Sequence, residues 1–219
     1  MAIPTKLSEF IDTMFHILSI PTGYWNSFPY NLGYYHGSYY TFDCVNLLKA
    51  VLNGWEDNPT VGYYVTDLSL TGDVNEWDFI SECRGLSTDF TQMNVCSALY
   101  MTGHIGCYMG GEFTRGGLIY NTIECTSGSI IGDGVVASYV DSNGVRLSHK
   151  YGTPIGQWSH NGLLTGWLEY DVQFVDPGRD TDPINPGGGN ANPPWWENPN
   201  LKGKKKFKWW MYMKQRNKR

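Results

Sequence analysis

Five cysteines and five histidines are the side chains of this sequence best suited to nucleophilic and general-base chemistry. An odd number of cysteines without a CxxC pair fits neither a disulfide framework nor a zinc site. A thiol attacks a carbonyl efficiently only after it loses its proton, so a catalytic cysteine needs surroundings that lower its pKa and a histidine that accepts the proton. We therefore expect no metal and no cofactor, and we look for one cysteine and one histidine that the fold would bring together.

Cys44 is the cysteine whose position favours such chemistry. Asp43 is a good helix N-cap, an apolar stripe follows over residues 45–52, and Gly54 is a stop signal. The pattern places Cys44 in the first turn of a helix, where the helix dipole favours a thiolate. Three other cysteines are expected to be small buried hydrophobic residues: Cys96, Cys107 and Cys125.

His104 is the candidate base, because it opens the glycine-bounded segment 103–110, which reads as a strand that would hold the ring rigidly. A third group should fix the orientation of the imidazole. Glu124, on the next expected strand, is the first choice, and Asn121 is the alternative. A structural histidine and a solvated glutamate are the competing interpretations of His104 and Glu124.

The segments FDCVNLLKAVLNGW and GHIGCYMGG together resemble the NlpC-type family of papain-like cell-wall peptidases. The preceding loop GYWNSFPYNLGYY is similar to the family segment that leads to the cysteine, and Glu124 is similar to the acidic third residue of the related CHAP amidases. The resemblance covers residues 21–124 and implies Cys44 as nucleophile, His104 as base and Glu124 as the orienting group. The chain departs from the family at Val45, where serine is frequent, and in the long insertion 56–91.

This resemblance implies a peptidoglycan hydrolase, either an endopeptidase or an N-acetylmuramoyl-L-alanine amidase, that acts by Cys–His acyl transfer. It makes Tyr24, Trp25 and Asp43 candidate substrate contacts, with packing inside the loop as the alternative for the two rings. Two other functions remain open. One is a different papain-like enzyme, such as a transglutaminase or deamidase, and the other is a non-catalytic virion structural or binding protein that retains the fold.

The elements that must position these residues suggest an α+β fold. Helical spacing covers residues 7–18 and 44–52, and residues 23–40 read as a long loop. Helices first and an antiparallel sheet afterwards predict a papain-like arrangement with N-terminal helices packed on the sheet. The expected strands are residues 95–101, 103–109, 117–125, 134–140, 147–151 and 167–174.

The chain is expected to divide into a hydrolase domain over residues 1–175, a Pro/Gly/Asn-rich linker over 176–200 and a basic aromatic tail over 201–219. The tail carries nine of the 16 Lys and Arg residues, so seven basic residues oppose 21 acidic ones elsewhere, a net charge of −14. The tail therefore predicts an anionic membrane or teichoic acid as partner, with single-stranded nucleic acid or a solubilising role as alternatives. The residues proposed for this contact are Lys204, Lys205, Lys206, Trp209 and Trp210.

The N-terminal segment lacks the pattern of a cleaved secretion signal, and the sequence holds no apolar run long enough to span a membrane. The absent signal, the linker and the cationic tail together resemble the architecture of a phage endolysin or a tail-associated wall hydrolase. Such a protein would lie in the host cytoplasm until lysis brings it to the wall, or it would travel with the virion.

Overall fold

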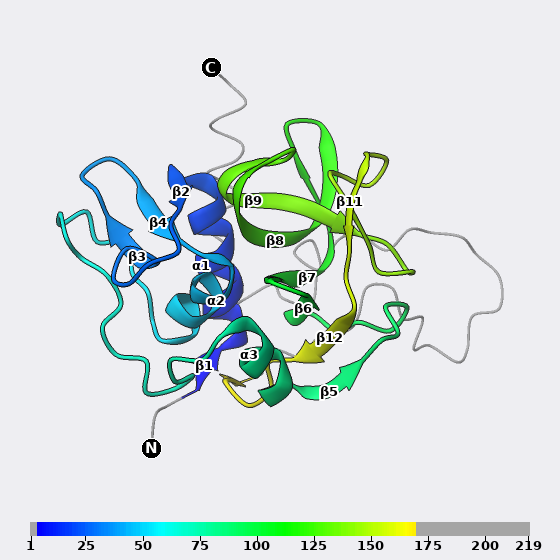
Figure 1. Cartoon of the computed structure of the whole chain (residues 1–219), viewed down its shortest axis with the longest axis horizontal. Helices are drawn as coiled ribbons and strands as arrows, with labels where there is room; N and C mark the ends of the chain where they lie inside the picture. The colour runs from blue at the N-terminus through cyan, green and yellow to red at the C-terminus, as the bar shows by residue number, and fades with distance from the viewer. Residues whose placement is uncertain (1–3, 170–219) are drawn as a thin grey trace, which may run out of the picture.

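The structure, a computed structural model, describes residues 4–169, which form a mixed α+β fold with a large antiparallel sheet and few helices (Figure 1). The predicted linker 176–200 and basic tail 201–219 lie outside the described residues, as does most of the expected strand 167–174. No helix among residues 4–169 is long and apolar enough to span a membrane.

The first helix, α1 (Leu7–Ser19), confirms the prediction for residues 7–18. Its N-cap is Lys6, which makes no side-chain capping bond. The Thr5 hydroxyl donates a hydrogen bond to the carbonyl of Leu52 at the end of the second helix. The apolar face of α1 is fully buried, so tertiary packing stabilises this helix without a capping side chain.

The large sheet has eight strands in the order β11-β10-β9-β8-β7-β6-β12-β5, and every neighbouring pair is antiparallel. The predicted strands at 95–101, 103–109, 117–125 and 134–140 are confirmed, although three of them are longer than expected. The strand expected at 147–151 is wrong, because only Leu147 of that range lies in a strand. Three strands had not been predicted: β5, β11 and β12. The bounds are β5 (Arg84–Ser87), β6 (Ser97–Met101), β7 (His104–Arg115), β8 (Leu118–Ser129), β9 (Gly132–Val140), β10 (Val145–Leu147), β11 (Pro154–Gln157) and β12 (His160–Leu163).

Residues 23–40 were expected to be a loop, and this expectation is wrong. Most of a three-stranded sheet lies there, made of β2 (Thr22–Tyr24), β3 (Leu32–Tyr35) and β4 (Tyr40–Phe42) in the order β2-β4-β3. The strands are only three or four residues long, and the glycines between them hide the alternation that marks a strand. A parallel pair of two-residue strands, β1 (Thr5–Lys6) and β13 (Leu168–Glu169), joins the two ends of the described chain.

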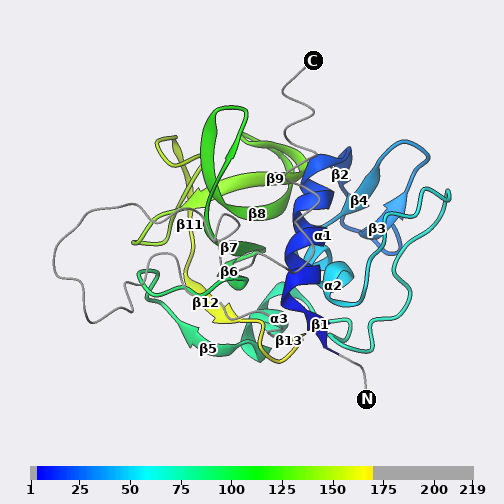
Figure 2. The ribbon, with the colours of Figure 1, turned by 180° about the vertical axis from the view of Figure 1, so that it is seen from behind.

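The second helix, α2 (Cys44–Leu52), contacts β3 of the small sheet and β7 and β8 of the large one. Figures 1 and 2 show it with α1 between the two sheets. Every residue of α2 is buried, and one core joins its apolar side chains to those of α1 and of strands β6–β9. The insertion 56–91 holds the third helix, α3 (Glu76–Glu82), and β5.

Candidate active site

The start of α2 is fixed by Asp43, which confirms the predicted N-cap. Its carboxylate accepts hydrogen bonds from the backbone N–H of Asn46 at 2.7 Å and from the side-chain amides of Asn46 at 2.6 Å and Asn31 at 2.9 Å. Such a carboxylate satisfies an orphan donor of the first helical turn. Asp43 was proposed as a substrate contact, but it is buried and these bonds occupy it, so its observed role is to hold Cys44 at the first helical position.

The Cys44 side chain lies in the core between α2 and the large sheet, with 9% of its surface exposed. Backbone N–H groups of Ile105 and Val45 donate hydrogen bonds to its sulfur. Ile105 follows His104 in the chain. The candidate base, His104, is therefore the neighbour of the residue on β7 that contacts the thiol. The fold therefore brings the backbone of the 104–105 segment to the sulfur across sixty residues of sequence.

The surroundings of Cys44 do not lower its pKa, which corrects the prediction made from the helix start. Burial raises the pKa of the Cys44 thiol to about 12, with the charge of Asp43 as the second cause. The hydrogen bonds from Ile105 and Val45 oppose this shift without overcoming it. In the resting protein at neutral pH, Cys44 is a thiol and not a thiolate.

We therefore expect iodoacetamide to alkylate Cys44 in the folded protein at pH 7 far more slowly than a free thiol, because a pKa of about 12 leaves about a thousandfold less thiolate than the ordinary value of 9. Cys83 is an internal reference, since it is buried to a similar extent and burial also raises its pKa to about 12. Mass spectrometry of tryptic peptides would give both rates. Fast alkylation of Cys44 beside slow alkylation of Cys83 would contradict the raised pKa.

His104 and Glu124 are brought together, as proposed. Nε2 of the His104 ring forms a very short hydrogen bond with Oε2 of Glu124. The ring also stacks on the indole of Trp158, with centroids 5.5 Å apart and planes inclined by 17°. Gly106 makes this arrangement possible, because a Cβ there would lie 3.2 Å from both the Trp158 ring and the Glu124 side chain.

Arg146, on β10, completes this group and was not foreseen from the sequence. Its Nε donates a hydrogen bond of 2.9 Å to Oε1 of Glu124. Its Nη2 lies 2.7 Å from Oε2 as an ion-pair contact that lacks hydrogen-bond geometry. The guanidinium also lies over the Trp158 ring, 5.7 Å from its centroid. A lone arginine on a short strand gave no signal of this role, because only the sheet order brings β10 beside β9 and β8.

Burial by itself would raise the pKa of Glu124, whose side chain is fully buried. The hydrogen bond and charge of His104, together with Arg146, outweigh burial and lower the pKa of Glu124 to about 2. Glu124 is therefore a carboxylate throughout the physiological range and is not a solvated strand residue. The Glu124 carboxylate, bound to Nε2 of His104, fixes the direction of the ring.

The depressed pKa makes Glu124 a source of acid-sensitive stability. A carboxyl group with a lower pKa in the folded state stabilises the protein above its unfolded pKa of about 4.5 and loses this contribution as pH falls towards about 2. The difference corresponds to about 3 kcal/mol.

We expect the unfolding free energy of Glu124→Gln, measured with urea, to fall less between pH 5 and pH 2.5 than that of the wild type. Glu82→Gln, at an exposed carboxylate at the end of α3, is the control and should behave as wild type. Equal acid sensitivity of wild type and Glu124→Gln would contradict the assignment.

Successive side chains of β7 point to opposite faces of the sheet, so the candidate base and the residues that contact the core lie on different faces. Ile105 and Cys107 join the core shared with Cys44, whereas Gly106 lies under Trp158 beside Glu124. His104 shares the face of Gly106, opposite to the face on which Ile105 contacts the Cys44 thiol. Within residues 4–169, no hydrogen bond joins the Cys44 sulfur to the His104 ring. Nδ1 of His104 likewise has no hydrogen-bond partner in this part of the chain.

Of the two rings proposed as substrate contacts, Tyr24 lies near the thiol and Trp25 lies further out. Burial raises the pKa of the Tyr24 phenol, followed by the charges of Cys44 and Asp43. Trp25 is 43% exposed, and its backbone N–H donates to the carbonyl of Phe42, two residues before Cys44. Both residues therefore border the candidate site, but at different depths.

Two further residues of this region were missed by sequence reasoning. Glu76, the first residue of α3, has a charge that helps to raise the pKa values of Cys44 and Tyr24, so the unmatched insertion 56–91 influences the electrostatics of the site. Cys125 lies on the same side, where its thiol donates to the carbonyl of Phe42 at 3.3 Å. Its burial was predicted, together with that of Cys96 and Cys107, and is confirmed.

Asn121, the alternative orienting group, is engaged elsewhere. Its side chain exchanges two hydrogen bonds with the backbone of Val140 on β9, at 2.9 and 2.8 Å. Among the described residues, no group of three or more His, Cys, Asp or Glu side chains is arranged to hold a metal ion. Comparison of the chain with protein-family models, with curated proteins and with solved structures found no match.

Proposed function

We propose that this chain is a papain-like cysteine hydrolase that cleaves an amide bond of peptidoglycan, with Cys44 as nucleophile, His104 as base and Glu124 as the orienting carboxylate. The observation that carries the proposal is the buried His104–Glu124–Arg146 group at the start of β7, beside the backbone N–H that contacts the Cys44 sulfur. A fully buried carboxylate on Nε2 leaves Nδ1 as the nitrogen that can accept a proton.

In this proposal, Cys44 begins the reaction as a thiol. The cycle requires Nδ1 of His104 to come within hydrogen-bond reach of the sulfur in the substrate complex, where catalytic hydrogen bonds are often shorter than in the free enzyme. Nδ1 takes the proton as sulfur attacks the carbonyl, and the imidazolium then protonates the leaving amine. Water, activated by the neutral ring, hydrolyses the thioester and returns the thiol.

The negative charge of Glu124 supports this cycle because it stabilises the imidazolium that forms when Nδ1 gains the proton. The N–H of Cys44 has no intrahelical acceptor at the first position of α2, and it can therefore donate to the oxyanion of the tetrahedral intermediate. Tyr24 lies close enough to interact electrostatically with Cys44, and its hydroxyl is a further candidate donor to substrate.

Digestion of purified peptidoglycan by the full chain tests the function directly. We expect soluble fragments, and mass spectrometry of their new termini would separate an endopeptidase from an amidase. A free lactyl group on the glycan indicates an amidase, and a free amine and carboxyl within the stem peptide indicate an endopeptidase. An absence of soluble fragments from walls of several peptidoglycan types would refute the proposal.

One observation favours a second function, a non-catalytic binding module that retains the fold. The Cys44 thiol is buried, has a raised pKa and makes no hydrogen bond to His104 within the described residues. A structural role for the His104–Glu124–Arg146 group would explain its contacts equally well. Binding to walls without release of fragments would support this second function.

A further inference from the structure

An exposed group of aromatic rings lies on the small sheet and its loops, next to the candidate site. Four of its side chains are solvent-exposed, and we call them the aromatic patch: Trp25 (43% exposed), Phe28 (67%), Tyr30 (37%) and Tyr39 (36%). Isolated exposed rings are common on protein surfaces, but a contiguous group of them marks an interaction site.

His36 holds three of the four rings of the patch together. Its ring stacks on Tyr39 with centroids 4.9 Å apart and planes inclined by 11°, and it contacts Tyr30 at 5.8 Å and Trp25 at 6.0 Å. Its Nε2 lies 3.0 Å from the hydroxyl of Thr41, and burial lowers its pKa. The centre of the patch is therefore uncharged at neutral pH, and its rings are fixed before any ligand arrives.

The patch carries no formal charge, which narrows the chemistry of its ligand. Residues 21–42 contain no Asp, Glu, Lys or Arg, in a chain whose first 200 residues are strongly acidic. Residues 21–42 themselves therefore offer a ligand no ionic partner. Within residues 4–169, the hydroxyls of Tyr30 and Tyr39 have no hydrogen-bond partner and are free to bind one. Flat rings with polar edges and no charge suit a neutral ligand that offers both apolar faces and hydroxyl groups.

We propose that the aromatic patch binds the glycan strand of the substrate, with N-acetylhexosamine rings stacked on Trp25 and Tyr39. The patch is continuous with the candidate site, because the Trp25 backbone bonds to Phe42 and Tyr24 lies by the thiol. This inference adds a substrate-binding surface to the proposed function, and the identity of its ligand as substrate rests on that function. A bound strand would deliver the amide that branches from it to Cys44 and lower the entropic cost of the reaction.

Isothermal titration of the full-length Cys44→Ala variant with a β-1,4-linked N-acetylglucosamine hexamer tests the inference without hydrolysis. We expect binding that Trp25→Ala weakens by about tenfold, as the loss of one stacked ring should, and that Trp25→Phe partly restores. Tyr39→Ala provides a second variant with the same expectation. Thermal unfolding of each variant would establish that it is folded.

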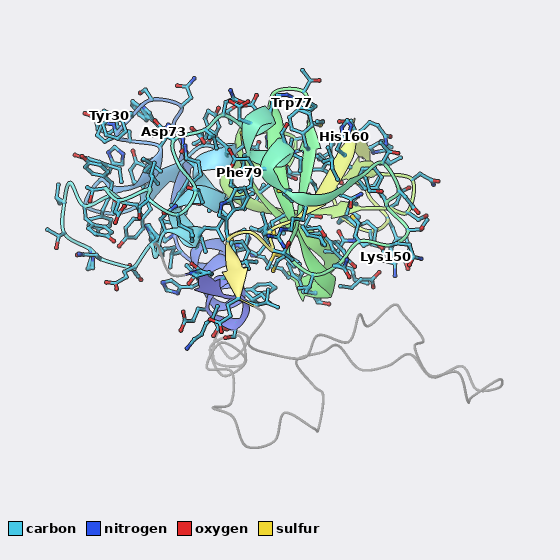
Figure 3. All side chains as sticks on the ribbon, turned by 90° about the horizontal axis from the view of Figure 1, so that it is seen from below. Tyr30, Asp73, Trp77, Phe79, Lys150 and His160 are labelled. Atoms are coloured by element: carbon cyan, nitrogen blue, oxygen red, sulfur yellow. The ribbon has the colours of Figure 1, made fainter. Side chains whose placement is uncertain are left out.

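Trp77→Ala is the matched control, since Trp77 is similarly exposed (48%) but lies on α3, well apart from Tyr30 in the view of Figure 3. It should leave the affinity within about twofold of the parent. Equal losses in Trp25→Ala and Trp77→Ala, or an absence of hexamer binding, would overturn the inference. So would Trp25-dependent binding to phosphatidylglycerol vesicles without binding to the hexamer. Sugar binding by a chain that releases no wall fragments would leave this inference standing while refuting the hydrolase.

Discussion

Replacement of Cys44 by alanine is expected to reduce the release of soluble fragments from purified peptidoglycan by at least about a thousandfold. The Cys44 thiol is the proposed nucleophile that forms the acyl intermediate, and the backbone N–H groups and rings of the site could only bind substrate. The measurement is the initial rate of fragment release, followed by mass spectrometry, at equal concentrations of wild type and variant.

Cys83→Ala is the matched control for this experiment. Cys83 is another buried free thiol whose pKa is raised to about 12, but it caps the end of α3, where its sulfur contacts the carbonyl of Phe79. Its variant should lose stability to a similar degree and keep its activity within about twofold. Equal release of soluble fragments by Cys44→Ala and wild type would show that Cys44 is not the nucleophile and would refute the proposed mechanism.

Replacement of Arg146 by methionine is expected to destabilise the fold by about 3 to 5 kcal/mol at pH 7. The substitution keeps much of the side-chain volume but leaves Glu124, fully buried, with His104 as its remaining hydrogen-bond partner. The carboxyl must then either stay charged at a high cost or take up a proton. Urea unfolding at pH 7 measures the loss. The double variant Arg146→Met, Glu124→Gln should recover part of it, because it removes the unpaired charge.

Lys150→Met is the control for the loss of a cation. Lys150 also forms an ion pair at 2.7 Å, with Glu112, but both side chains are partly exposed, and Figure 3 shows Lys150 at the periphery of the described structure. Water already screens this pair, so the variant should lose less than about 1 kcal/mol. Equal losses in Lys150→Met and Arg146→Met would show that the buried group contributes no more than a surface pair.

Local signals in the sequence were sufficient to predict α1, α2 and four strands of the large sheet. Asp43 specifies the start of α2 through a hydrogen bond to Asn46, three residues away, so a short window of sequence contains the cause. The pairing of His104 with Glu124 was also within reach, because β7 and β8 are consecutive strands and consecutive strands usually pair. The three short strands of residues 22–42 were not predicted, because they are too short to show the two-residue hydrophobic period of a strand.

Only the tertiary structure decided the electrostatics of the site. The pKa of Cys44 depends on burial beneath the large sheet and on the charges of Asp43 and Glu76, and burial outweighs the helix-start effect on which the sequence argument relied. Arg146 and Trp158 lie more than twenty residues beyond Glu124 in the chain and reach the site through β10 and the segment that follows β11. Sequence therefore determined which residues are available and which local elements carry them. Their ionisation and mutual contacts depend on desolvation and on distances between segments remote in the chain, which only the folded packing sets.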